Sequence, residues 1–172
     1  FSVETTVAYS DRDVRDAVRR AAGSRRGIRV AGSGHSFTPI VEPRDEMLVL
    51  AGPRGVISAD ADAKNAVVYA HSPLRELGPE LWRCGLALRN QGDTDSQTLA
   101  GATATGTKGS GAALPNISAS ITSLRLVDGT GEVRHLDEAS NPTELRKIFD
   151  ELTKIYKTGQ AETLVHYFGL RE

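Results

Sequence analysis

The chain has 172 residues, which suits one domain or two small lobes, and this length buries enough apolar surface to fold without cross-links. Its formal net charge of -1 gives no electrostatic footprint for nucleic acid or an anionic membrane, and no apolar stretch reaches the length of a membrane span, so we expect neither partner. Cys84 is the only cysteine, which excludes an intrachain disulfide and a cysteine-based metal framework and favours a cytoplasmic protein.

The first fifty residues predict a strand, a helix and a second strand that runs into a glycine cluster. The strand covers Ser2 to Ala8, and Ser10 and Asp11 can cap the helix that follows. The apolar face of this helix consists of Val14, Ala17, Val18 and Ala21. Ile28 to Ala31 is a short buried strand that leads directly into Gly32-Ser33-Gly34-His35-Ser36.

The remaining pattern predicts three more strands, a helix, a hairpin and a final amphipathic helix. A helix begins near Leu74, with Ser72 as its cap and Pro73 in its first turn. The predicted strands are Met47–Leu50, Val56–Ala59 and Ala66–Ala70, the hairpin joins Ile121–Val127 to Glu132–Leu136, and the final helix covers Glu144–Tyr156.

Glycines at alternate positions let the segment Gly32 to Ser36 hold successive backbone N–H groups in one concave array, because glycine tolerates positive φ angles. Such an array, with the hydroxyls of Ser33 and Ser36, suits a diphosphate. A tight turn at a strand end explains the same pattern, and both interpretations stay open for this motif alone. A Rossmann-type dinucleotide fold is excluded, because the third glycine is missing and Phe37-Thr38-Pro39 does not open a helix. His35 alone is weak evidence for a site, because a lone histidine is more often a structural or surface residue than a functional group.

A second segment, Gly92 to Gly111, is rich in Gly, Ala and Thr, so a bulky ligand can approach its backbone. Together with Arg29 to Phe37, Leu74 to Pro79 and Gly131-Glu132-Val133, it resembles the FAD-binding domain of the vanillyl-alcohol oxidase superfamily, also called PCMH-like. Within that superfamily the chain is similar to the branch of aldonolactone oxidases and alditol (xylitol) oxidases. The resemblance extends from about Val3 to Asp137. A peptidoglycan-precursor reductase shares the general fold, but the long second segment matches the oxidase branch better.

The resemblance implies an α+β fold with two lobes, in which a small sheet and a larger mixed sheet with flanking helices hold FAD between them. It divides the chain into a small lobe at residues 1–50, a larger lobe at 51–140 and an atypical helical segment at 141–172. It also implies that the Gly-Val-Ile/Val-Thr segment and the long substrate domain of such proteins are missing. We expect the two glycine segments to converge on one cleft.

The resemblance also implies which residues hold FAD. The first glycine segment would surround the pyrophosphate, and a histidine at the position of His35 commonly bonds covalently to the flavin 8α-methyl group, for which a neutral imidazole is a competent nucleophile. Lys108 stands where these oxidases usually have histidine, and it is equally well explained as a solvated lysine. His71 is interpreted as a surface residue at a strand end. The implied cofactor residues are Gly32, Ser33, Gly34, His35, Ser36, Asp95, Ser96, Gln97, Gly101, Thr105, Gly106, Lys108 and Gly109.

These features predict the FAD domain of an oxidoreductase that acts on CH–OH groups of a polyol or a sugar lactone. Hydride would pass from the substrate carbon to flavin N5 and then to oxygen or another acceptor. No catalytic residue and no metal ligand is assigned, and His166 and Tyr167 are interpreted as packing residues because they lie in an apolar run. The alternative is a truncated module that binds a flavin or another nucleotide and has no activity of its own.

Overall fold

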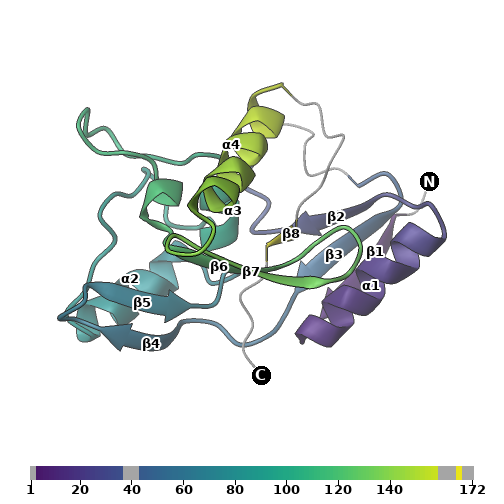
Figure 1. The fold of residues 1–172 in the computed structure, drawn as a ribbon, viewed down its shortest axis with the longest axis horizontal. Helices are drawn as coiled ribbons and strands as arrows, with labels where there is room; N and C mark the ends of the chain where they lie inside the picture. The colour runs from purple at the N-terminus through teal and green to yellow at the C-terminus, as the bar shows by residue number, and fades with distance from the viewer. Residues whose placement is uncertain (1–2, 37–42, 159–165, 168–172) are drawn as a thin grey trace.

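The computed structural model describes residues 3–36, 43–158 and 166–167. Its helices and strands are β1 (Glu4–Ala8), α1 (Asp11–Gly23), β2 (Ile28–Ala31), β3 (Glu46–Leu50), β4 (Val56–Asp60), β5 (Asn65–Val68), α2 (Leu74–Arg83), α3 (Leu99–Ala104), the 3-10 helix η2 (Ile117–Ser120), β6 (Ser123–Val127), β7 (Val133–Asp137), α4 (Pro142–Thr158) and β8 (His166–Tyr167) (Figure 1). Within this described part, no helix has both the length and the apolar composition needed to cross a membrane.

The N-terminal strands form a parallel sheet in the order β1-β3-β2, and α1 packs against it (Figure 1). Ala31, the last residue of β2, lies opposite Val49 of β3. The carboxyl ends of parallel strands meet at one edge of a sheet, so the glycine segment that follows Ala31 lies at this edge.

Helix α1 forms because its first turn is capped and one face is apolar, as the sequence predicts. The Ser10 hydroxyl accepts the backbone N–H of Asp13, and the Asp13 carboxylate accepts that of Ser10, which makes a capping box. The buried face then packs on the sheet and on Val127 of β6, so the first core reaches beyond the N-terminal sheet. Its members are Ala8, Val14, Ala17, Val18, Ala21, Ile28, Leu48, Leu50 and Val127.

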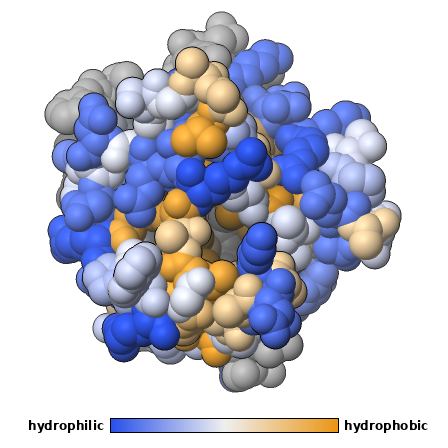
Figure 2. All heavy atoms as spheres, turned by 90° about the vertical axis from the view of Figure 1, so that its left-hand side faces the viewer, coloured by the Kyte–Doolittle hydropathy of each residue, from blue (hydrophilic) through white to orange (hydrophobic). Residues whose placement is uncertain are grey.

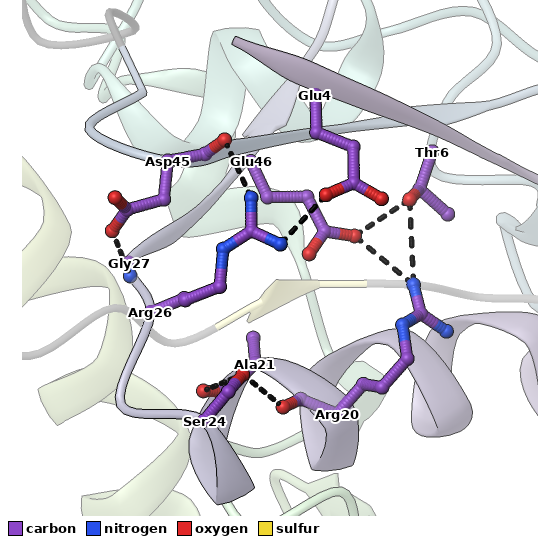
Figure 3. A network of polar contacts seen from close by, with 9 residues as sticks. All are labelled: Glu4, Thr6, Arg20, Ala21, Ser24, Arg26, Gly27, Asp45 and Glu46. Carbon is purple, nitrogen blue, oxygen red and sulfur yellow. Dashed lines mark hydrogen bonds and ion pairs between the residues drawn. The ribbon is translucent and has the colours of Figure 1, made fainter.

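A polar network closes the opposite, amino-terminal edge of the same sheet (Figure 3). Glu46 begins β3 and is only 1% exposed, which requires an opposite charge nearby. Its carboxylate accepts the Thr6 hydroxyl at 2.6 Å and pairs with Arg20 of α1 at 3.1 Å. Arg26 pairs with Glu4 at 2.6 Å in the same region. These charges therefore balance one another at the sheet edge that does not carry the glycine segment.

The other strands form two antiparallel sheets, β4-β5 and β7-β6-β8. In β8, His166 and Tyr167 pair with Val127 and Leu126. Together with the helices, one parallel and two antiparallel sheets give the predicted α+β class. Two further cores hold this part together: α2, α3 and η2 share one with β4-β5, and α4 shares the other with the β6–β7 hairpin. The proposed division of the chain at residues 50 and 140 stays a prediction.

Two local predictions differ from the structure. Residues 99–104, for which no helix was predicted, form helix α3, because Thr98 caps the helix by accepting the N–H of Gly101 at 3.1 Å. Ser72 does not cap α2. The cap position is Pro73, and the Ser72 hydroxyl instead accepts the N–H of Gly55 at 2.8 Å.

Candidate cofactor site

The first glycine segment leaves β2 as a turn at the surface. Gly34 adopts a φ of 69°, in the left-handed region that favours glycine, and a Cβ placed there would meet no atom within 4 Å. Ser33 and His35 are exposed and Ser36 is half-buried. The turn is therefore open to a ligand on the side of Gly34. Phe37-Thr38-Pro39 lie outside the described residues.

The two glycine segments touch each other. A Cβ added to Gly32 would lie 2.8 Å from the Thr98 hydroxyl oxygen, and the three nearest heavy atoms all belong to Thr98. Thr98 begins α3 inside the second segment. The structure thus places Gly32, the first residue of this segment, against the start of α3, and the shared cofactor cleft stays a prediction. Thr98 was absent from the predicted residues, although a threonine before a run of small residues is a recognisable cap signal.

The end of α3 explains two of the predicted glycine-segment residues. Gly106 has a φ of 65°, its N–H donates to the Thr103 carbonyl, and the Thr107 N–H donates to the Ala102 carbonyl at 3.0 Å. This is the Schellman arrangement, in which glycine ends a helix because it tolerates the left-handed region. The Thr105 hydroxyl donates to the Gly101 carbonyl at 3.0 Å. Gly106 therefore has a structural role that does not depend on a ligand.

The chain then returns beside the start of the second segment. The Gln97 amide and the Thr107 hydroxyl exchange hydrogen bonds at 3.1 and 3.3 Å, and the Thr107 hydroxyl lies 3.2 Å from that of Thr105. A Cβ on Gly109 would lie 2.3 Å from the Gln91 carbonyl oxygen, so only glycine fits there. The result is a half-buried cluster of hydroxyl and amide groups close to the helix end.

Asp95, Ser96 and Lys108 lie on the outer side of this segment. The carbonyls of Asp95 and Gln97 accept the N–H groups of Arg75 and Leu74 at 2.9 Å, which satisfies the first turn of α2. The Ser96 hydroxyl lies 2.8 Å from that of Thr94. The side chains of Asp95 and Lys108 are exposed, so one negative and one positive charge border the segment.

His71 is not a surface residue, and that sequence interpretation is wrong. It is 6% exposed, and its Nε2 lies 3.0 Å from the Gly52 carbonyl oxygen. Burial is the main cause that lowers the pKa of His71 below 6.5, and Arg54 adds to it while the hydrogen bond to Gly52 opposes it. The neutral ring therefore donates to the carbonyl and packs at the edge of the Tyr69 ring. Its sequence neighbours carry no signal of this burial.

A separate apolar cavity of about 780 Å³ lies between the β4-β5 sheet, α3 and the β6–β7 hairpin. Figure 2 views the side of the molecule on which β4 and β5 lie, and it shows apolar residues gathered around a hollow. The described residues that line the cavity include Ile57, Leu124 and Leu136 but none of the predicted cofactor residues. Within the described part of the chain, no group of three His, Cys, Asp or Glu side chains could hold a metal ion.

Curated proteins match about three quarters of this chain. L-gulono-1,4-lactone dehydrogenase from Mycobacterium tuberculosis (strain H37Rv) is 41% identical over 132 residues, which are 77% of this chain and 31% of the relative. L-gulonolactone oxidase from Mus musculus is 29% identical over 129 residues, 75% of this chain and 29% of the relative. This chain thus spans about a third of the length of its curated relatives.

Solved structures share the fold. The wild-type BBE-like 1 protein from Physcomitrella patens matches 95% of this chain and 35% of its own with a TM-score of 0.74 at 25% identity. The 6-hydroxy-D-nicotine oxidase from Arthrobacter nicotinovorans matches 98% of this chain and 36% of its own with a TM-score of 0.71 at 22% identity. The family model described as "FAD binding domain" matches residues 6–137. The chain therefore belongs to the FAD-binding domain family of flavoenzymes, among relatives that are sugar-lactone oxidases and dehydrogenases.

Proposed function

We propose that this chain supplies the FAD-binding part of an oxidoreductase that acts on a CH–OH group of a sugar lactone, with a polyol as the alternative substrate class. The lactone is favoured because the curated relatives are named for gulono- and arabinono-lactones. The observation that carries the proposal is the contact between Gly32 and Thr98, because it joins the two glycine segments at one place.

The residues around this contact fit the polar half of FAD. The open turn at Gly34, with the hydroxyls of Ser33 and Ser36, offers donors of the kind that bind a pyrophosphate. The exposed ammonium of Lys108 suits a phosphate or flavin oxygen. Small residues in the second segment leave its backbone accessible to a bulky ligand, and polar side chains lie beside them. The small residues are Gly101, Thr105, Gly106 and Gly109, and the polar ones are Asp95, Ser96 and Gln97.

Bound FAD would supply the hydride acceptor of the reaction, and the protein would supply binding and orientation. The two glycine segments would hold the phosphates of the cofactor and fix their position. No general base is assigned among the described residues. A second candidate is a module that binds a flavin or another nucleotide without turnover of its own, and the match to about a third of the relatives' length favours it.

We also propose that His35 bonds covalently to the flavin 8α-methyl carbon. It lies next to Gly34 in the open turn and is exposed. An imidazole nitrogen would bond to that carbon with loss of one proton from each partner, and the two electrons released would pass through the flavin to dioxygen or another acceptor.

FAD binding is tested by titrating the purified chain with FAD and following the quenching of flavin fluorescence. Saturable quenching that a molar excess of ADP, added as a competitor, does not abolish supports the proposal. A flavin-supplemented protein that retains no FAD after desalting would refute it.

Covalent attachment is tested by acid precipitation of the flavin-loaded protein and by the mass of the intact chain. His35→Ala should lose the acid-stable flavin, whereas the matched control His135→Ala, at an exposed histidine of β7, should keep it. Acid-stable flavin in His35→Ala would rule out this attachment site. Peroxide release on addition of L-gulono-1,4-lactone or xylitol would separate the enzyme from the module without turnover.

A further inference from the structure

Helix α1 carries a second stripe of side chains that its buried apolar face does not use. Asp11, Arg15 and Arg19 follow one another at every fourth position and therefore lie on one side of the helix. All three contact the β6–β7 hairpin: Asp11 pairs with Arg125 of β6, the Arg15 Nε donates to the Gly131 carbonyl at 3.2 Å, and Arg19 pairs with Glu132 at 2.5 Å.

The hairpin is shaped for this contact. Gly131 has a φ of 80° and is buried, and a Cβ there would lie 2.5 Å from the Arg19 Cγ and 3.2 Å from the Arg15 carbonyl oxygen. A glycine is thus needed both for the turn and for the close approach of α1. The Asp11 and Arg125 side chains are only 12% and 24% exposed. A buried pair of this kind adds little net stability but penalises any arrangement that separates the charges.

The two partners in this contact carry different glycine segments. Helix α1 packs through the first core on the sheet in which β2 leads into Gly32. Leu126 and Leu136 of the hairpin share the third core with Leu145 and Phe149 of α4, and Ala100 of α3, in the second segment, packs against this core. The α1–hairpin contact therefore links the two elements that carry the candidate cofactor residues, by a route separate from the contact of Gly32 with Thr98.

Geometry gives this second link a function. Val127 of β6 also joins the first core, but apolar packing is non-directional and sets no unique rotation of α1 on the hairpin. The stripe from Asp11 to Arg19 extends over eight residues of helix, about 12 Å, and adds directional contacts that fix this rotation. We propose that Asp11, Arg15 and Arg19 are positioning residues that fix the relative orientation of the two glycine segments, and that flavin affinity depends on them. This inference rests on the proposed binding of FAD.

The test reverses one charge and restores it. Arg19→Glu places a carboxylate beside Glu132, and the double variant with Glu132→Arg restores the pair in the opposite sense. The matched control is Arg26→Glu with Glu4→Arg, because the Arg26–Glu4 pair has a similar length and similar side-chain exposure, 38% and 53% against 45% and 63%, but lies within the N-terminal sheet region (Figure 3). Two readouts are taken: FAD affinity by fluorescence quenching, and hydrogen exchange of segments 32–36 and 98–109 in the flavin-free protein.

Arg19→Glu should weaken FAD binding about fivefold, which corresponds to about 1 kcal/mol at 25 °C, and Glu132→Arg should restore it. Exchange should rise in both segments for Arg19→Glu but not for Arg26→Glu, even where both variants lower the thermal midpoint equally. The inference is overturned if Arg26→Glu weakens FAD binding as much as Arg19→Glu, or if Arg19→Glu changes neither readout. A wild-type chain that binds no FAD refutes the proposed function, whereas the exchange measurement still decides whether the stripe orders the two segments.

Discussion

The contact between Gly32 and Thr98 can be measured with a double-mutant cycle. A methyl group at residue 32 would lie 2.8 Å from the Thr98 hydroxyl oxygen, closer than the 3.4 Å at which ordinary contact begins. That oxygen also accepts the Gly101 N–H at 3.1 Å as the cap of α3. Gly32→Ala therefore forces the Thr98 side chain to move, and the movement weakens the helix cap.

The structure sets the size of each effect. Overpacking of this kind costs about 1–3 kcal/mol, and the lower chain entropy of unfolded alanine returns about 0.4–1 kcal/mol, so we expect Gly32→Ala to destabilise by about 1–2 kcal/mol. Thr98→Ala loses the cap, about 1 kcal/mol. In the Thr98→Ala background the two closest atoms are gone, because only the Thr98 Cβ remains, 3.9 Å away. Gly32→Ala should then be close to neutral, which gives a coupling energy of about 1–2 kcal/mol between the two sites.

The assay is urea unfolding of the flavin-free chain, with the free energy of unfolding of all four proteins extrapolated to water. The control replaces Thr98→Ala by Ser10→Ala, which removes the cap of α1, a helix that does not supply any of the three nearest atoms at residue 32. In that cycle the two effects should add to within about 0.5 kcal/mol. Additive effects of Gly32→Ala and Thr98→Ala would show that the two glycine segments do not touch.

Three further predictions concern single residues. Gly109→Ala should destabilise the chain by about 1–3 kcal/mol in the same assay, because the new Cβ would lie 2.3 Å from the Gln91 carbonyl oxygen. The control, Gly23→Ala at the end of α1, should be neutral or stabilising, because a Cβ there meets nothing within 4 Å. The free energy of unfolding should fall as the pH drops below 6.5, because His71 takes up a proton at its ordinary pKa only when the chain is unfolded. His71→Gln should reduce this dependence of the unfolding free energy on pH, measured by urea titrations at several pH values. An unchanged pH dependence would contradict a buried, neutral His71. The hydrogen bond from the Thr130 hydroxyl is the main cause that lowers the pKa of Asp128, so Asp128→Asn should be less stable than the wild type above pH 3.8. The difference in stability should shrink as the pH falls through and below 3.8. A difference that persists undiminished at pH 2 would count against this role of Asp128.

The sequence predicts the N-terminal elements well because their signals are local. Ser10 caps α1 as predicted, with Asp13 three residues later as its partner in place of Asp11, and the buried residues Val14, Ala17, Val18 and Ala21 repeat with the period of a helix. The parallel order β1-β3-β2 has no such local signal, because it depends on contacts between residues some forty positions apart, such as Thr6 with Glu46. The three-strand small lobe was therefore expected from the family resemblance rather than from periodicity.

The misses have a common physical cause. Helix α3 is only six residues long and lies in a segment whose many glycines are typical of loops, so its local signal is weak, and it is stabilised by burial of Leu99 and Ala102 in a core that the sequence does not reveal. His71 looked like a surface residue because its burial depends on Gly52 and Tyr69, which come from the chain before it. In both cases tertiary contacts outweigh local propensity.

The glycines of the two segments are required for two different reasons, the packing of the chain itself and the binding of a ligand, and Gly34 is the position that distinguishes them. Gly32 and Gly109 are required by the chain's own packing and Gly106 by the end of α3, so their replacement lowers stability with or without a cofactor. A Cβ on Gly34 meets nothing, so Gly34→Ala costs only the strain of the left-handed region, about 1–2 kcal/mol. If relief of that strain turns the neighbouring N–H groups away from the pyrophosphate, one hydrogen bond to a charged group is lost, and FAD affinity should fall about tenfold or more. Gly109→Ala should behave in the opposite way, with a large loss of stability and a small loss of FAD affinity. Its FAD titration is made at temperatures at which the variant stays folded. Equal FAD affinity in Gly34→Ala and the wild type would mean that the turn after β2 is a strand exit and does not bind phosphate.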